Sequence, residues 1–117
     1  EVVTGMIGCG AQLVAFTTGR GNPTGHPIAP VIKITGNSRT FHSMEENFDF
    51  DASSIISEGR PVDEVGHQLL DLIVRVASGE LTSAERFGGT ELFCVGRRHG
   101  YRRKTREELW AGHSCPL

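Results

Sequence analysis

The fold is decided by the stretch Leu13-Val14-Ala15-Phe16-Thr17-Thr18-Gly19-Arg20-Gly21, followed by Pro30-Val31-Ile32-Lys33-Ile34-Thr35. Each part contains a short run of apolar residues, which is typical of a buried strand. Proline at the first position of the second run removes no hydrogen bond that the strand needs. The segment between them, residues 19–27, holds three glycines and two prolines, which excludes regular structure. The sequence therefore predicts two strands joined by a loop.

The clearest helix is predicted from Pro61 to about Ser78. Its acidic residues Asp63 and Glu64 suit the positive end of a helix, and Gly79 suits a left-handed cap. Apolar residues recur at three- and four-residue steps and predict one buried stripe, formed by Val62, Val65, Leu69, Leu72, Ile73 and Val76.

Shorter elements are predicted around these. One helical turn is expected within residues 39–47, a short helix within 53–57, a capped turn over 82–86 and a third strand over 91–95. Residues 5–10 hold three glycines and are predicted to form a turn, with no helix.

Buried strands separated by helical segments predict an α/β fold: a small, mostly parallel sheet with flanking helices. One long helix covers only one face of such a sheet. We therefore expect the chain to be part of a larger domain, whose remainder lies in the same polypeptide or in a partner subunit. Residues 1–96 would form this partial domain.

The 117 residues are enough for one domain, and the composition is that of a globular protein. Residues 1–96 carry six basic and twelve acidic side chains, whereas residues 97–117 carry six basic and two acidic ones. The acidic body argues against nucleic acid as the main partner. Residues 97–117 are predicted to form a flexible, solvated basic tail.

No apolar run reaches the roughly 18 residues that span a membrane, so a membrane partner is not expected. The chain begins with Glu1 and shows no leader, which we take as the sign of a fragment. Three cysteines without CxxC spacing argue against disulfides and a zinc site, and favour reduced thiols in the cytoplasm.

The loop after the first predicted strand is the main candidate for a binding site. Ligands of open α/β sheets bind outside the carboxyl ends of the strands. There, Thr17 and Thr18 offer hydroxyls, Arg20 a planar guanidinium, and Gly19 and Gly21 close access to the backbone. The spacing fits neither a dinucleotide fingerprint nor a P-loop. Anion binding and a purely structural turn both remain open.

Three charged residues could support such a site. Lys33 lies within the second strand. An edge or solvated position is favoured, and the alternative is a buried position aimed at the same anion as Arg20, or at Asp49 or Asp51. Asp49 and Asp51 share one face of an extended segment, where they could bind a cation, although solvated or helix-capping side chains are favoured. Among the five histidines, His26 in the glycine-rich loop is the candidate ligand-binding residue. Cys9, between two glycines, is expected to be a small buried residue.

The two strand segments resemble the C-terminal region of the altronate dehydratase and galactarate dehydratase family. That family carries an FTTGRG signature, found here as Phe16-Thr17-Thr18-Gly19-Arg20-Gly21, and an asparagine after the next strand, matched by Asn37. Residues 48–52 resemble the family segment D-[IF]-N-A-G, and residues 77–82 resemble its ASGekT helix end. The similarity covers roughly residues 4–95.

The resemblance implies the C-terminal part of a metal-dependent hydro-lyase that dehydrates a sugar acid of the altronate or galactarate type to a 2-keto-3-deoxy acid. It implies a divalent metal, iron(II) or alternatively manganese(II). Substrate binding is expected from residues 17–21, His26 and Asn37, and catalytic support from Lys33, Asp49 and Asp51. We expect a homo-oligomeric parent enzyme and no turnover by the isolated chain.

Two other functions stay open. A sulfolactate sulfo-lyase resembles the same family and eliminates sulfite from a small acid. A non-catalytic assembly module would use the glycine-rich loop only structurally. Asp51 and Ser53 stand where the family has Asn and Gly, which bears on the choice of substrate.

Overall fold

A three-stranded parallel sheet forms the centre of the computed structural model, which describes residues 2–88. Its strands are β1 (Val14–Thr17), β2 (Val31–Thr35) and β3 (Phe50–Asp51), in the order β1-β2-β3. Val14 pairs with Val31, and Ile34 pairs with Phe50. The sheet is parallel with flanking helices, so the predicted α/β class is confirmed.

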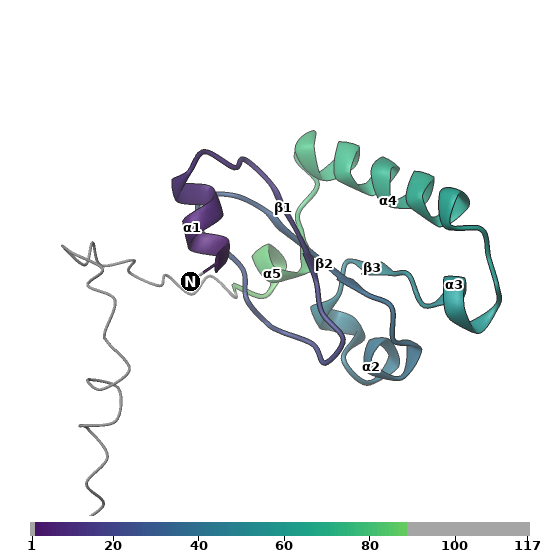
Figure 1. Ribbon diagram of the computed structural model, residues 1–117. Coiled ribbons are helices and arrows are strands. Elements are labelled where there is room, and N and C mark those ends of the chain that lie inside the picture. Colours follow the sequence, from purple (N-terminus) through teal and green to yellow (C-terminus); the bar gives the residue numbers. More distant parts are fainter. Residues whose placement is uncertain (1, 89–117) are drawn as a thin grey trace, which may run out of the picture.

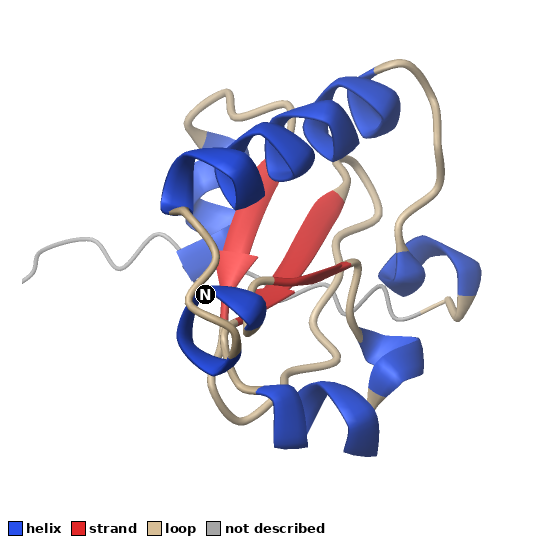
Figure 2. Ribbon diagram, turned by 90° about the vertical axis from the view of Figure 1, so that its right-hand side faces the viewer, coloured by secondary structure: helices blue, strands red, loops and turns tan. Residues whose placement is uncertain are grey.

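The long helix α4 (Val62–Ala77) covers one face of this sheet (Figure 2). Ile32 and Ile34 of β2 pack there against Leu72 and Val76 of α4. Burying such a side chain contributes about 1.5–3 kcal/mol relative to leaving it exposed. The predicted stripe is confirmed at its centre, but Val62, at the first turn, is 65% exposed and is not part of the core.

The opposite face is covered by the short helix α1 (Val2–Gly8), whose Val3 packs against Val14 and Val31. The prediction that residues 5–10 contain no helix is therefore wrong at its start. Two apolar residues one helical turn apart, Val3 and Ile7, contact the sheet, and this tertiary packing outweighs the low helix propensity of glycine.

Four short helical segments complete the described fold: α2 (Ser38–Ser43), the 3-10 helix η1 (Glu45–Asn47), α3 (Ser54–Ser57) and α5 (Ser83–Arg86). α3 and α5 lie where they were predicted, and the single turn predicted within residues 39–47 is present as two elements, α2 and η1. Thr82 and Glu85 form a capping box at the start of α5. Figure 1 shows α1, α2 and α5 on the side of the sheet that faces away from α4 (Figure 1).

Two other predictions concern the ends of the chain. Cys9 is exposed, because it follows α1 on a short surface turn, so its expected burial is wrong. The strand predicted over 91–95 and the tail over 97–117 lie outside the described residues. Within residues 2–88, no helix has the length and apolar character that crossing a membrane requires.

Candidate functional site

An open crevice of about 450 Å³ lies at the carboxyl ends of the three strands. It is formed where β1 and β2 end and where the chain leaves β3, and its lining residues are Thr17, Thr18, Gly19, Ile34, Gly36, Asn37 and Ala52. This is the position at which ligands bind in open α/β sheets. The structure thus brings together four residues that the sequence predicted, namely Thr17, Thr18, Gly19 and Asn37.

Asn37 has a fixed orientation at the rim of the crevice. Its side-chain oxygen accepts hydrogen bonds from the backbone N–H groups of Arg39, at 3.1 Å, and Thr40, at 3.3 Å, and so caps α2. Because those partners are donors, the atom facing them is the oxygen. The NH₂ group of Asn37 is left as a donor, and it makes no hydrogen bond within residues 2–88.

The loop after β1 is held in place at two points. The N–H of Thr18 donates to the carbonyl of Ile34 at 2.9 Å, and the hydroxyl of Thr40 donates to the carbonyl of Gly19, also at 2.9 Å. Gly21 has a φ of +87°, a conformation that favours glycine. Among the described residues, we find no acceptor for the backbone N–H groups of Gly19, Arg20 and Gly21.

Arg20 follows directly on the crevice and is exposed. It takes part in none of the ion pairs within residues 2–88. None of the side chains that line the crevice is a carboxylate. The lining therefore offers two hydroxyls and an amide NH₂, and the guanidinium of Arg20 follows it directly in the chain. Hydrogen-bond donors of these kinds suit a carboxylate or another oxyanion.

Lys33 lies in the central strand β2, two residues before the strand's carboxyl end, and is only 1% exposed. The favoured edge or solvated position is therefore wrong: β2 has a strand on each side and is covered on both faces. Burial lowers the pKa of the Lys33 ammonium from its ordinary value of 10.5, and the negative charge of Asp49 raises it in part.

Asp49 joins three segments of the fold. Its two carboxylate oxygens accept the backbone N–H of Lys33, at 2.7 Å, and of Ser83 at the start of α5, at 2.6 Å. The hydroxyl of Ser83 donates to the carbonyl of Phe48 at 3.0 Å. Asp49 therefore fixes the beginning of β3 and α5 against β2, and its side chain is not part of the crevice lining.

Asp51 and His26 also lie outside the lining of the crevice. One oxygen of Asp51 accepts the N–H of Ser53 at 2.8 Å, just before α3. His26 is buried, its Nδ1 accepts the N–H of Ile28 at 3.3 Å, and its Nε2 has no hydrogen-bond partner among the described residues. Within residues 2–88, no group of three metal-binding side chains comes together.

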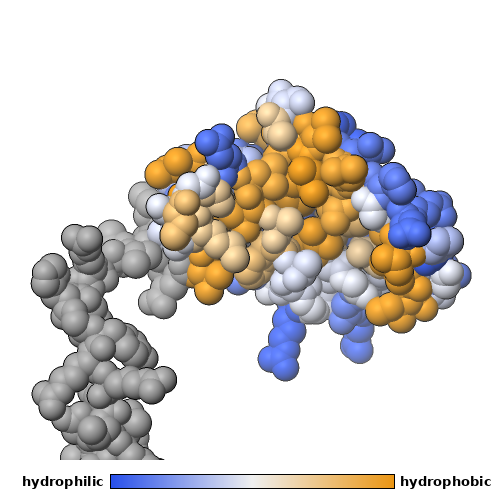
Figure 3. Space-filling view, turned by 45° about the horizontal axis from the view of Figure 1, so that its top comes forward, coloured by the Kyte–Doolittle hydropathy of each residue, from blue (hydrophilic) through white to orange (hydrophobic). Residues whose placement is uncertain are grey.

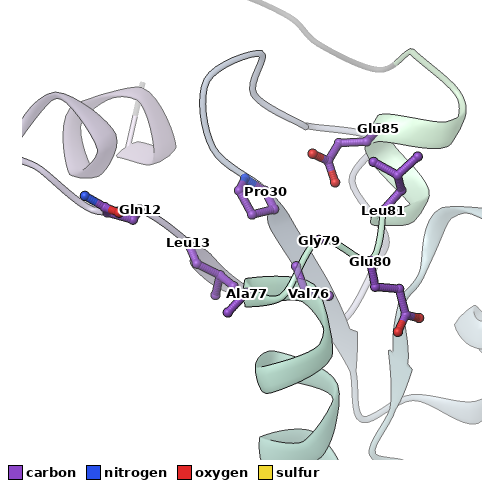
Figure 4. Close-up of a pocket in the computed structure, with 9 residues that line it drawn as sticks. All are labelled: Gln12, Leu13, Pro30, Val76, Ala77, Gly79, Glu80, Leu81 and Glu85. Atoms are coloured by element: carbon purple, nitrogen blue, oxygen red, sulfur yellow. The ribbon is translucent and has the colours of Figure 1, made fainter.

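A second cavity, of about 350 Å³, lies at the opposite end of the sheet (Figure 4). Residues before β1 and β2 meet there with the segment that follows α4, and the lining residues are Gln12, Leu13, Pro30, Val76, Ala77, Gly79, Glu80, Leu81 and Glu85. It has two carboxylates and no basic side chain, so it does not favour an anion.

Comparison with protein families gives a match to the C-terminal region of D-galactarate/altronate dehydratases over residues 1–99. This match covers most of the chain, including every residue of the crevice. The chain belongs to this family. The resemblance that the FTTGRG segment indicated is thereby confirmed.

Individual relatives agree with this assignment. The chain is 41% identical over 91 residues to the (2R)-sulfolactate sulfo-lyase subunit beta of Chromohalobacter salexigens, covering 78% of this chain and 23% of the relative. It is 36% identical over 87 residues to the altronate dehydratase of Escherichia coli, covering 74% and 17%. It is 37% identical over 79 residues to the galactarate dehydratase (L-threo-forming) of E. coli, covering 62% and 15%. The chain spans less than a quarter of each.

Four residues of the site were not predicted from the sequence, and two of them, Ile34 and Ala52, contribute apolar side chains to the lining. Gly36 lines the crevice after β2, and Thr40 holds the loop through the carbonyl of Gly19. A signal for Gly36 was present, because it directly follows a predicted strand, as Thr18 and Gly19 follow the other. Thr40 had none, since its partner lies 21 residues away.

Proposed function

We propose that this chain supplies the carboxylate-binding part of the active site of a hydro-lyase, which dehydrates a sugar acid of the altronate or galactarate type. The observation that carries the proposal is the crevice at the carboxyl ends of the strands, lined by hydroxyl and amide groups without a carboxylate and adjoining Arg20. Membership of the dehydratase family supports the same reaction.

The reaction explains why such a site needs donors. Loss of the proton from the carbon beside the carboxylate leaves an electron pair that delocalises onto the carboxylate oxygens. The neighbouring carbon then loses hydroxide, proton and hydroxide leave together as water, and the resulting enol becomes a 2-keto-3-deoxy acid. Hydrogen-bond donors already directed at the carboxylate stabilise the charge that develops there.

In this proposal Arg20 binds the substrate carboxylate in bidentate fashion. Thr17, Thr18, the N–H groups of Gly19 and Gly21 and the NH₂ of Asn37 surround the remaining oxygens. Asp49 acts as a positioning residue, because it bonds the backbone of Lys33 and so fixes β2 against the approach to β3. The buried ammonium of Lys33 supplies positive charge beside it. Asp51 and His26 support the loops beside the crevice.

The divalent metal implied by the family, iron(II) or manganese(II), does not fit the described residues, which form no group of three metal-binding side chains. We therefore place its ligands, and the base that removes the proton, outside residues 2–88. No step of the reaction above is assigned to the metal. The exposed thiol of Cys9 suits a reducing compartment, and we propose the cytoplasm as the location.

A second candidate function is elimination of sulfite from a sulfonated hydroxy acid. It is favoured by the 41% identity to a sulfolactate sulfo-lyase subunit. Both reactions begin with loss of a proton beside a carboxylate, so one binding site suits both. Assay of the parent enzyme with altronate, galactarate and sulfolactate separates them: formation of a 2-keto-3-deoxy acid supports the dehydratase, and release of sulfite the lyase.

The test of the carboxylate site is Arg20→Ala in the parent enzyme, with Arg86→Ala as control. Loss of a charge-assisted bidentate contact is expected to reduce kcat/KM about 100-fold. Arg86 is also exposed, and its contact with Glu80 is long, at 4.0 Å, so its variant is expected to retain activity. Unchanged kcat/KM in Arg20→Ala would remove the assigned role.

A further inference from the structure

The strand β1 has a free edge within the described sheet. β2 lies on one side of it, and none of the described strands lies on the other. The N–H groups of Val14 and Thr18 donate to carbonyls on the β2 side, namely those of Pro30 and Ile34. Since alternate residues of a strand point in opposite directions, the N–H and C=O groups of Ala15 and Thr17 are directed at the free edge. Such an edge is a template for another strand.

The C-terminal end of α4 lies near the residues that lead into β1. Leu70, Val74 and Ala77 are spaced along one flank of the helix, and the first two are 55% and 57% exposed. Ala77 lines the same cavity as Leu13, which precedes β1, so this stripe begins on the β1 side at the C-terminal end of the helix (Figure 4). The view onto α4 and the β1 side shows hydrophobic residues gathered over a broad area (Figure 3).

The position of α1 indicates where the additional strand comes from. α1 packs on the face opposite α4 and leads through a short turn into β1. A helix that precedes a parallel strand and packs on its sheet is typical of a β-α-β unit, which is right-handed in about 98% of cases. α2, in the connection from β2 to β3, lies on the same side as α1 (Figures 1 and 2).

Two right-handed connections whose helices lie on the same face of a parallel sheet move the chain in the same direction across the sheet, from one strand to the next. The connection through α2 steps from β2 to β3. A connection through α1 must therefore end at β1 from a strand on the other side of β1, which is the free edge. The strand that precedes α1 is therefore expected to lie next to β1, at its free edge.

We propose that the free edge of β1 binds a parallel strand from the part of the parent polypeptide that precedes α1. The family match describes a C-terminal region, and the chain spans less than a quarter of its relatives, so such a preceding part exists in the family. The carboxyl end of this strand would lie beside Thr17 and complete the crevice on its open side. The proposal rests on topology and does not depend on the reaction.

The test is amide hydrogen exchange, resolved by residue, in the full-length parent protein. If a strand pairs with β1, the N–H groups of Ala15 and Thr17 are expected to exchange as slowly as that of Phe16, within about tenfold. If the edge is free, Ala15 and Thr17 exchange about 100-fold or more faster than Phe16, and the proposal is overturned. Phe16, which is directed at β2, is the control within the same strand.

A pair of variants tests whether the exposed apolar stripe of α4 is covered in the parent. Leu70→Lys in the parent is expected to lower the melting temperature by roughly 3 °C or more, whereas Gln68→Lys, on the other flank of α4, leaves it unchanged. A melting temperature equally unaffected by both variants contradicts the proposal. So does an intermolecular contact between two Ala15 residues in a sample mixed from isotope-labelled and unlabelled protein, because it would assign the edge to a second copy.

Discussion

The two ends of the central sheet have opposite chemistry. The carboxyl end, between Thr17 and Asn37, is lined by hydroxyls, amides and small residues, and Arg20 adjoins it. The amino end is lined by apolar side chains and by the carboxylates of Glu80 and Glu85. The two cavities are similar in size, about 450 and 350 Å³, so volume alone does not distinguish a binding site from a packing gap.

The difference between the ends lies in how their polar groups are used. At the amino end, Glu85 accepts two hydrogen bonds from Thr82, and Glu80 pairs with Arg75 at 2.8 Å. At the carboxyl end, within residues 2–88, the hydroxyls of Thr17 and Thr18 and the NH₂ of Asn37 have no partner. Polar groups that a fold does not use for itself are the groups available to a ligand.

The largest expected effect comes from placing the same charge at each end in the parent enzyme. Thr17→Asp puts a carboxylate into the proposed anion site, and repulsion is expected to reduce kcat/KM about 1000-fold. Leu81→Asp, at the half-exposed rim of the other cavity, is expected to leave kcat/KM within about twofold. An equal reduction of kcat/KM in the two variants would contradict the assignment of anion binding to the carboxyl end alone.

A smaller effect is expected from removing the support below the carboxyl end. Asp49→Ala leaves the N–H groups of Lys33 and Ser83 without their acceptors, and the free energy of unfolding is expected to fall by about 3 kcal/mol. Asp71→Ala, on the exposed side of α4, serves as the control. Urea denaturation measures both, and a loss below about 1 kcal/mol in Asp49→Ala would show that the contacts are dispensable.

The glycines at the two ends offer a third comparison. Gly21 and Gly79 both have positive φ, +87° and +110°, so Ala at either position is expected to cost about 1–2 kcal/mol. A Cβ at Gly21 would also lie 2.8 Å from the Sδ of Met44, whereas Gly79 has open space. Gly21→Ala is therefore expected to be the more destabilising in thermal denaturation. The reverse order would mean that Met44 moves aside freely.

The smallest effect is a dependence of stability on pH. Burial lowers the pKa of Lys33, so between its folded pKa and the unfolded value of 10.5 the unfolded chain binds more protons. Stability contributed by this group is then lower at neutral pH and rises as pH increases through that window. In Lys33→Met this part of the rise is expected to disappear from the melting temperature measured against pH. An identical slope in both proteins would contradict the assignment.

The sequence predicted most of the fold because its strands and long helix have strong local patterns. The runs at 13–16 and 30–35 and the helix at 61–78 were confirmed, as were the short helices capped by Asn37 and Thr82. α1 was missed because its glycines mask two apolar contacts with the sheet. The alternation over residues 48–51 indicated the extended backbone of β3, but two residues are too few to predict a strand of the sheet.

The candidate site was predicted only where a local rule applied. Residues 17–19 and Asn37 follow strands, and the rule that ligands bind at carboxyl ends places them together. The burial of Lys33 depends on helices that pack from both sides of the sheet, and the contact of Asp49 with Ser83 joins residues 34 positions apart. Such tertiary contacts produce no pattern in the neighbouring sequence from which they could be predicted.

The binding of a sugar diacid can be followed residue by residue in the parent protein by titration with galactarate, using backbone amide NMR. Binding at the carboxyl end should shift the amide signals of residues 17–21 and 36–37, leave those of residues 79–85 in place, and be lost in Arg20→Ala. Signals that move only at residues 79–85, or none in either segment, would show that the glycine-rich loop does not hold the carboxylate.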